Sequence, residues 1–105
     1  MLEEDLTPGE KLYLWRRRKN KRVWEYARQY GVSRYAYQRW ENDLGDDIPI
    51  IKLMGVEQAE QFVILRKRSG MTQKELAARM GISRSWLHLV EAGKVSMKQA
   101  IEFWC

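Results

Sequence analysis

The segment from residue 71 to residue 93, MTQKELAARMGISRSWLHLVEAG, constrains the fold more than any other part of the chain. Thr72 can cap a helix, and Glu75 stands three residues later, which is the spacing of a capping box. The apolar face of this helix would consist of Leu76, Ala77 and Met80. Gly81 can then end the helix. The segment therefore predicts a short helix followed by a tight turn.

A second helix is predicted directly after this turn. Ser83 can act as its N-cap, and Leu87 and Val90 then have the i, i+3 spacing of an inward-facing stripe. The remaining positions point elsewhere and carry Arg84, Ser85, His88 and Leu89. Two short helices joined in this way form a helix-turn-helix.

Several short matches carry a resemblance to the helix-turn-helix of Cro and C1 type phage repressors. They are Thr72-Gln73, Glu75-Leu76-Ala77, Met80-Gly81-Ile82-Ser83 and Glu91-x-Gly93-Lys94. Upstream, Phe62, Leu65 and Arg66 resemble the family's first helix. Downstream, residues 96–101 resemble a further short helix of the family. The resemblance implies a bundle of small helices that places Arg84 and its neighbours in a DNA major groove.

The chain repeats itself at an offset of 50 residues. Residues 7–54 laid over residues 57–104 without a gap give ten identities in 48 pairs, where about three are expected by chance. In the first copy the identical residues are Glu10, Arg16, Arg18, Glu25, Ala27, Gly31, Ser33, Arg34, Glu41 and Ile51. We therefore predict an all-α fold of two tandem small helical bundles, each with a helix-turn-helix. The expected domains are residues 1–54 and 55–105.

The first copy is expected to contain three helices, at residues 8–19, 23–30 and from 34 to 40 or 41. Thr7 and Glu10 have capping-box spacing at the start of the first helix. A last short helix is expected in each copy, capped by Asp46 in the first and by Ser96 in the second. The two copies should pack rigidly together, because residues 54–56 are too few and too apolar for a flexible linker. The candidates for the seam between them are Ile50, Ile51, Leu53, Ile101, Phe103 and Trp104.

An Arg–Glu pair is expected to tie the first helix of each copy to the end of the third. The family resemblance implies that this pair is partly buried and formed by Arg16 with Glu41 and by Arg66 with Glu91. A guanidinium can hold a carboxylate through two parallel hydrogen bonds, which would fix the angle between the helices. We interpret these four residues as scaffold.

Candidate base-reading residues lie on the third helix of each copy. They are Arg34, Tyr35, Gln38 and Arg39 in the first copy and Arg84, Ser85 and His88 in the second. A capped recognition helix presents its first turn to base edges, where Arg can bind guanine and Gln can bind adenine. The family resemblance adds Gln73, at the start of the second helix. A solvated helix face is the alternative interpretation.

A run of basic residues follows the first helix, with six cations in the seven residues 16–22. Contact with DNA phosphates is one interpretation of Arg17, Arg18, Lys19, Lys21 and Arg22. The other is a solvated charge run that also offsets the dipole at the end of the helix. The net charge of +5 suits a nucleic-acid partner.

Large apolar residues are expected on the surface at Trp24, Trp86 and Leu89. Trp86 and Leu89 stand at i and i+3 on the third helix of the second copy, where they could meet thymine methyl groups or form a protein contact. Trp24 aligns with Lys74 on the exposed side of the second helix, which indicates the seam between copies or a dimer contact.

The sequence offers no catalytic constellation. One His, a single Cys at position 105 and no phosphate-binding glycine loop leave nothing to activate a nucleophile or hold a metal. We expect no enzyme, no cofactor and no small-molecule substrate. No apolar run approaches the roughly 18 residues of a membrane span, and the acidic start at residues 3–5 is unlike a signal peptide. A cytoplasmic protein without a membrane partner is expected.

These patterns predict a sequence-specific regulator of transcription that binds double-stranded DNA. A repressor of a phage or another mobile element is the expected kind, with two helix-turn-helix units acting as a covalent pseudo-dimer. The alternative is a protein-interaction module, an anti-activator or adaptor, in which one unit docks another regulator. Homodimers formed through Trp24, Trp86 or Leu89 also stay open.

Overall fold

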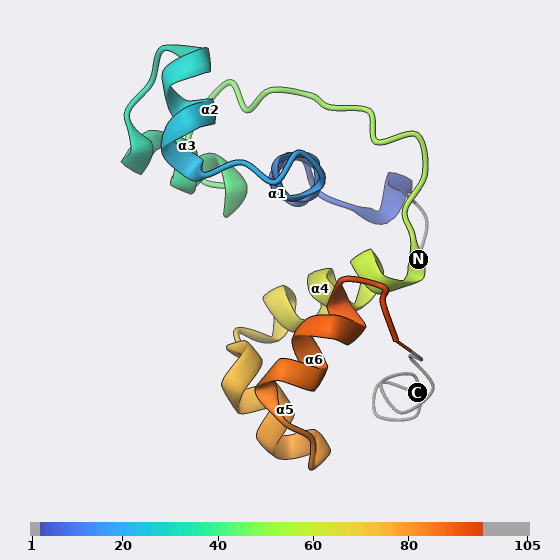
Figure 1. The fold of residues 1–105 in the computed structure, drawn as a ribbon. Helices are drawn as coiled ribbons and strands as arrows, with labels where there is room; N and C mark the ends of the chain where they lie inside the picture. Colours follow the sequence, from blue (N-terminus) through green and yellow to red (C-terminus); the bar gives the residue numbers. More distant parts are fainter. Residues whose placement is uncertain (1–2, 96–105) are drawn as a thin grey trace. The chain divides into compact units, whose positions relative to one another are not determined.

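The computed structural model describes residues 3–95, and all regular structure within that range is helical (Figure 1). The all-α prediction is therefore confirmed. The chain divides into two compact units, Met1–Val56 and Glu57–Cys105. The helix expected at residues 96–101, its cap Ser96 and the seam candidates Ile101, Phe103 and Trp104 lie outside the described residues.

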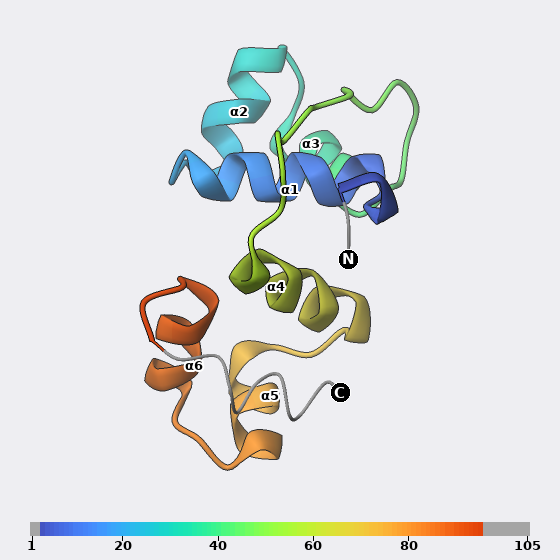
Figure 2. The same ribbon diagram turned by 90° about the vertical axis from the view of Figure 1, so that its right-hand side faces the viewer.

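The first unit begins with a short 3-10 helix, η1 (Glu3–Asp5), and continues with three α-helices. These are α1 (Pro8–Arg18), α2 (Val23–Tyr30) and α3 (Arg34–Glu41). The second unit contains α4 (Gln58–Ser69), α5 (Gln73–Met80) and α6 (Arg84–Glu91), which Figure 2 shows from a second direction. Each helix of the second unit begins 50 residues after its counterpart, as the internal repeat predicts.

The turn between the second and third helix has the same geometry in both units. Gly31 and Gly81 adopt left-handed backbone angles, with φ of 70° and 72°, which end α2 and α5. Ser33 and Ser83 then cap α3 and α6, because each hydroxyl accepts a hydrogen bond from the backbone N–H three residues later. These local signals explain why the helix bounds follow so closely from the sequence.

Of the two predicted capping boxes, the one at the start of α1 is present, and the one at the start of α5 lacks one of its two hydrogen bonds. Thr7 and Glu10 bond reciprocally at the start of α1, as expected. At α5 the Thr72 hydroxyl accepts from the N–H of Glu75, but the same hydroxyl also donates to the Glu75 carboxylate. That carboxylate therefore bonds to the side chain of its cap.

The core of the first unit is aromatic. The buried residues Leu12, Tyr26, Ala27 and Tyr37 are packed with partly buried Trp15, Val23, Tyr30, Val32, Trp40, Ile48 and Ile51. Tyr26 lies 4.8 Å from Trp15 and 6.3 Å from Tyr37, measured between ring centroids. Aromatic pairs at such distances add to the stabilisation that burial provides. Tyr and Trp side chains therefore make up much of this core.

The core of the second unit is mainly aliphatic at the corresponding positions. Leu76, Ala77 and Leu87 form one buried cluster, and Phe62 and Val90 form another. Met80 is partly buried against both clusters. The same helix arrangement is thus filled with Leu, Met and Val where the first unit has Tyr and Trp.

The short helix expected after Asp46 is wrong, because residues 42–57 contain no helix. Asp47 adopts a left-handed conformation with φ of 56°. Pro49 also disfavours helical backbone angles at the residue before it. The carbonyl oxygen of Asp46 instead accepts a hydrogen bond from the indole Nε1 of Trp40 at 3.1 Å. This segment is a connector between α3 and α4.

The connector residues proposed for a seam behave differently from one another. Ile50 is 85% exposed. Ile51 packs against the aromatic core of its own unit. Leu53 is buried, with 3% of its surface exposed.

Two corresponding positions, one on the first helix and one after the third, carry different residues in the two units: Gly9 and Asp43 in the first, Ala59 and Gly93 in the second. A Cβ on Gly9 would lie 2.4 Å from the carbonyl oxygen of Trp40, while Asp43 accepts bonds from the Gly9 N–H and the Thr7 hydroxyl. In the second unit Ala59 replaces this glycine and Gly93 replaces the aspartate, with a Cβ on Gly93 reaching 3.6 Å from that of Ala59. The Asp43 carboxylate therefore helps to cap the start of α1.

Candidate nucleic-acid interface

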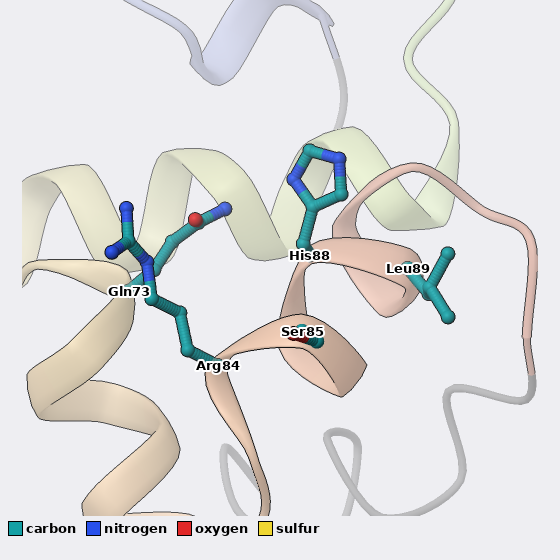
Figure 3. Close-up of a pocket in the computed structure, with 5 residues that line it drawn as sticks. All are labelled: Gln73, Arg84, Ser85, His88 and Leu89. Carbon is teal, nitrogen blue, oxygen red and sulfur yellow. The ribbon is translucent and has the colours of Figure 1, made fainter.

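The second unit brings its predicted base-reading residues together around one open depression. Its lining consists of Gln73, Arg84, Ser85, His88 and Leu89 (Figure 3). Gln73 comes from the first turn of α5 and the other four come from α6. The Arg84, Ser85 and His88 side chains are exposed, and Leu89 is partly buried. The fixed turn at Gly81 places both helix starts on this one face.

Gln73 is held from beneath by the buried ion pair of its unit. Its amide Nε2 donates to Glu91 Oε1 at 2.9 Å. Arg66 donates to the same carboxylate through Nε at 2.7 Å and through a second nitrogen at 3.2 Å. The predicted Arg66–Glu91 pair is confirmed. Its carboxylate also holds the amide of Gln73, which lines the depression.

The first unit contains the same ion pair without the glutamine. Arg16 donates to Glu41 at 2.6 and 3.1 Å, as predicted. Burial alone would lower the pKa of the Arg16 guanidinium, but its bonds to Glu41 raise that pKa overall. Val23 stands where the second unit has Gln73, and its side chain packs in the aromatic core.

The first unit nevertheless exposes all of its predicted base-reading residues on α3. Arg34, Tyr35, Gln38 and Arg39 are exposed, and 69% of the Tyr35 surface is accessible. The Arg39 guanidinium lies 5.9 Å from the centroid of the Tyr35 ring. A cation at this distance from a ring is weakly attracted to it, so the two side chains restrain each other.

The predicted phosphate-contacting run contains residues that face solvent and one residue, Arg18, that binds the connector. Lys19, Lys21 and Arg22 are exposed after α1, and Arg17 is partly buried. Arg18 has a structural role that the sequence interpretation missed. Its guanidinium donates to the carbonyl oxygens of Leu53 and Gly55, both at 2.5 Å.

The large apolar surface residues do not form one group. Trp24 is 48% exposed on α2 and Trp86 is 42% exposed on α6. Leu89 lines the depression beside Arg84, Ser85 and His88, whereas Trp86 is not part of that lining. Leu89 therefore belongs with the polar candidates, although sequence analysis grouped it with Trp86.

A neighbouring depression adds a cation that the sequence interpretation missed. It is lined by Arg66, Thr72, Gln73, Lys74 and Arg84. Lys74 follows Gln73 at the exposed start of α5, where its position in the first turn of the second helix was the available signal. Lys74 and Arg84 together give this face positive charge.

Two further features bear on the kind of site. Within residues 3–95 no group of three or more His, Cys, Asp or Glu side chains is arranged to hold a metal ion. The longest described helix has 12 residues, and none of the described helices is long and apolar enough to cross a bilayer.

Comparison with protein families gives one match, in the second half of the chain. Residues 57–101 match the family model of a helix-turn-helix domain. No curated protein and no solved structure matches the chain. The matched range contains α4, the α5–turn–α6 unit and the residues of the depression. This part of the chain is similar to a helix-turn-helix domain, and α5, the turn at Gly81 and α6 have that arrangement.

Proposed function

We propose that the protein is a sequence-specific DNA-binding regulator of transcription, a repressor from a phage or another mobile element. The observation that carries the DNA-binding proposal is the shared lining of one open face by Gln73, Arg84, Ser85 and His88 in a helix-turn-helix domain. The resemblance to Cro and C1 type repressors supports the choice of repressor and of a mobile element. The residues used are suited to binding and not to catalysis, so we propose no enzymatic activity.

In this proposal α6 enters the major groove with its first turn toward the bases. We propose that Arg84 donates two hydrogen bonds to a guanine and that the methyl groups of Leu89 contact the methyl group of a thymine. His88 can donate to a base acceptor or to a phosphate. Lys74 lies at the start of α5, where phosphate contacts commonly position the reading helix.

We propose that the first unit is a second helix-turn-helix that reads its own half-site with α3. The support is the matching helix bounds, the matching caps Ser33 and Ser83, and the exposure of the polar residues of α3. Arg34 and Arg84 occupy equal positions, but Arg39 stands where the second unit has Leu89. The two half-sites should therefore share one guanine and differ at the base that faces Arg39 or Leu89.

The first experiment is selection of bound sequences from a random pool of double-stranded DNA. The proposal expects an enriched site with two unlike halves about one helical turn apart. Binding should weaken steeply as salt rises, since phosphate contacts release counterions. No enrichment of any sequence would count decisively against this function.

Matched variants then identify the reading residues. Arg84→Ala should weaken binding to the enriched site by roughly 5- to 150-fold, the value of one bidentate base contact. Arg79→Ala removes an exposed cation from the last turn of α5 and serves as the matched control. Equal losses in both variants would indicate a general charge effect. Repression is tested separately with a reporter gene placed behind the enriched site.

A second candidate function is a protein-binding module, and the exposure of Trp86 outside the depression favours it. In that case Trp86→Ala should abolish association with a partner regulator while DNA binding is unchanged. Sedimentation of the protein at several concentrations tests the related proposal of homodimers. A monomer at all concentrations would exclude a dimer formed through Trp24 or Trp86.

A further inference from the structure

Two charged side chains of the first unit hold the last part of the connector. The carboxylate of Glu3 accepts hydrogen bonds from the backbone N–H groups of Leu53 and Gly55, at 2.5 and 2.9 Å. The guanidinium of Arg18 binds the carbonyl oxygens of the same two residues, both at 2.5 Å. We call this set of four bonds the connector clamp.

The backbone of the connector is shaped to fit the clamp. Met54 has a left-handed φ of 63° and Gly55 a φ of 110°, and the N–H groups of Leu53 and Gly55 on this turned stretch both bind one carboxylate. The Met54 side chain is 90% exposed, so apolar packing does not hold this residue in place. The bonds to the backbone N–H groups of Gly55 and Leu53 lower the pKa of the Glu3 carboxyl group, because they stabilise its charged form.

The chain becomes part of the second unit almost immediately after the clamp. Glu57 is the N-cap of α4 and forms a capping box with Glu60. Only Val56 therefore stands between the last clamped residue and the first residue of the helix cap. Two steps of extended chain from Gly55 to Glu57 span at most about 7 Å.

We propose that Glu3 and Arg18 determine which separation of two DNA half-sites the protein accepts. This inference rests on the proposed function, in which both units read DNA. With the clamp closed, the chain joining the units is a single residue, so one spacing should be bound far better than others. With the clamp open, burial of the Leu53 side chain alone would hold this part of the connector, so the units could reach half-sites at several spacings.

A purely stabilising role for the clamp predicts a different result. Loss of the clamp would then lower the stability of the first unit and weaken binding at every spacing alike. A positioning role changes the dependence on spacing and leaves the affinity for an isolated half-site unchanged. The ratio of affinities between spacings therefore separates the two roles.

The experiment uses the full chain with Glu3→Gln and Arg18→Met together. The matched control is Glu4→Gln with Lys52→Met, which changes the same charges at two exposed neighbouring positions. Binding is measured on duplexes made from the enriched site, with base pairs inserted or deleted one at a time between the halves. Duplexes with one half-site are measured in parallel.

We expect the unchanged protein and the control to favour one spacing by about tenfold or more over its neighbours. The clamp variant should bind neighbouring spacings within about threefold of one another and keep its affinity for single half-sites. Amide exchange at Leu53 and Gly55 should become faster in the clamp variant. The single variant Glu3→Gln should give an intermediate result and replaces the double variant if that variant does not fold.

Two other outcomes would overturn the inference in distinguishable ways. An unchanged spacing profile in a variant whose Leu53 and Gly55 amides exchange faster would leave the proposed function intact and remove the positioning role. An enriched site with a single half, or no enriched site, would remove both the inference and the two-unit part of the proposed function.

Discussion

The amide of Gln73 donates a 2.9 Å hydrogen bond to Glu91, the carboxylate that also binds Arg66. The corresponding position in the first unit is Val23, so Glu41 binds Arg16 without this third residue. The Glu91 side chain is fully covered, whereas 7% of the Glu41 side chain remains exposed. The second unit thus links its ion pair to its proposed DNA-contacting face, whereas Val23 in the first unit has no side-chain amide to make this bond.

The first prediction compares Glu91→Ala with Glu41→Ala. Glu91→Ala removes the carboxylate that neutralises the partly buried Arg66 guanidinium and should lower the free energy of unfolding by about 3 to 5 kcal/mol. It should also weaken binding to the second half-site, because Gln73 loses its acceptor. Glu41→Ala should destabilise less and leave that half-site unaffected. Urea unfolding followed by circular dichroism measures the first effect, and equal losses in both variants would contradict the prediction.

The second prediction concerns the tight contact at Gly9. Gly9→Ala places a methyl group 2.4 Å from the Trp40 carbonyl oxygen, which is backbone and cannot move aside easily. We expect the free energy of unfolding to fall by about 1 to 3 kcal/mol. The reciprocal change Ala59→Gly relieves no clash and should cost only about 0.5 to 1 kcal/mol through helix propensity. Thermal unfolding of both variants tests the order, and a smaller loss for Gly9→Ala would refute it.

The third prediction is an alkaline loss of stability confined to the first unit. Burial raises the pKa of the Tyr26, Tyr30 and Tyr37 hydroxyls, most strongly for Tyr37. The unfolded chain releases these protons near pH 10, while the folded unit retains them. The stabilisation is therefore fully present below pH 10 and decreases as the pH rises above it.

Tyrosinate absorbance reports on this transition specifically, because all five tyrosines of the chain lie in the first unit. Ionisation of the buried tyrosines should coincide with loss of helical circular dichroism. Tyr37→Phe should shift the transition to higher pH, since it removes the most strongly affected group. Ionisation of all tyrosines in a fully helical protein would contradict the prediction.

The fourth prediction concerns sequence preference at one base. Leu89→Arg gives the second unit the residue that the first unit has at Arg39. The base facing position 89 should change from thymine to guanine in a repeated selection, with a preference of roughly 5- to 150-fold. Leu89→Met keeps an apolar side chain and is the control. An unchanged base would show that Leu89 does not face the DNA.

The helices and their caps were predictable because their determinants are local. Gly31 and Ser33 end one helix and start the next within three residues, and their counterparts do the same in the second unit. The convergence of Gln73 and Arg84 followed from the same turn. These elements depend on spacing, which a sequence displays directly.

The connector and Arg18 were not predictable for the opposite reason. Arg18 donates to carbonyl oxygens of residues that lie 35 and 37 positions further along the chain. The backbone carbonyl oxygen of Asp46 accepts a hydrogen bond from the Trp40 indole. A run of basic residues gives no sign of which member will meet a distant backbone segment. The helix expected after Asp46 does not form. The hydrogen bond from the Trp40 indole to the Asp46 carbonyl oxygen and the left-handed backbone of Asp47 outweigh the helix-capping tendency of the Asp46 side chain.

The exchange of Gly9 and Asp43 for Ala59 and Gly93 has a genetic consequence. A repeated gene segment can recombine with itself and so create hybrid copies. A hybrid with the first helix of the second copy and the third helix of the first would place the Ala59 methyl group against the Trp40 carbonyl oxygen. Such a hybrid should therefore be less stable than either unit, because each first helix fits only the third helix of its own copy at this contact.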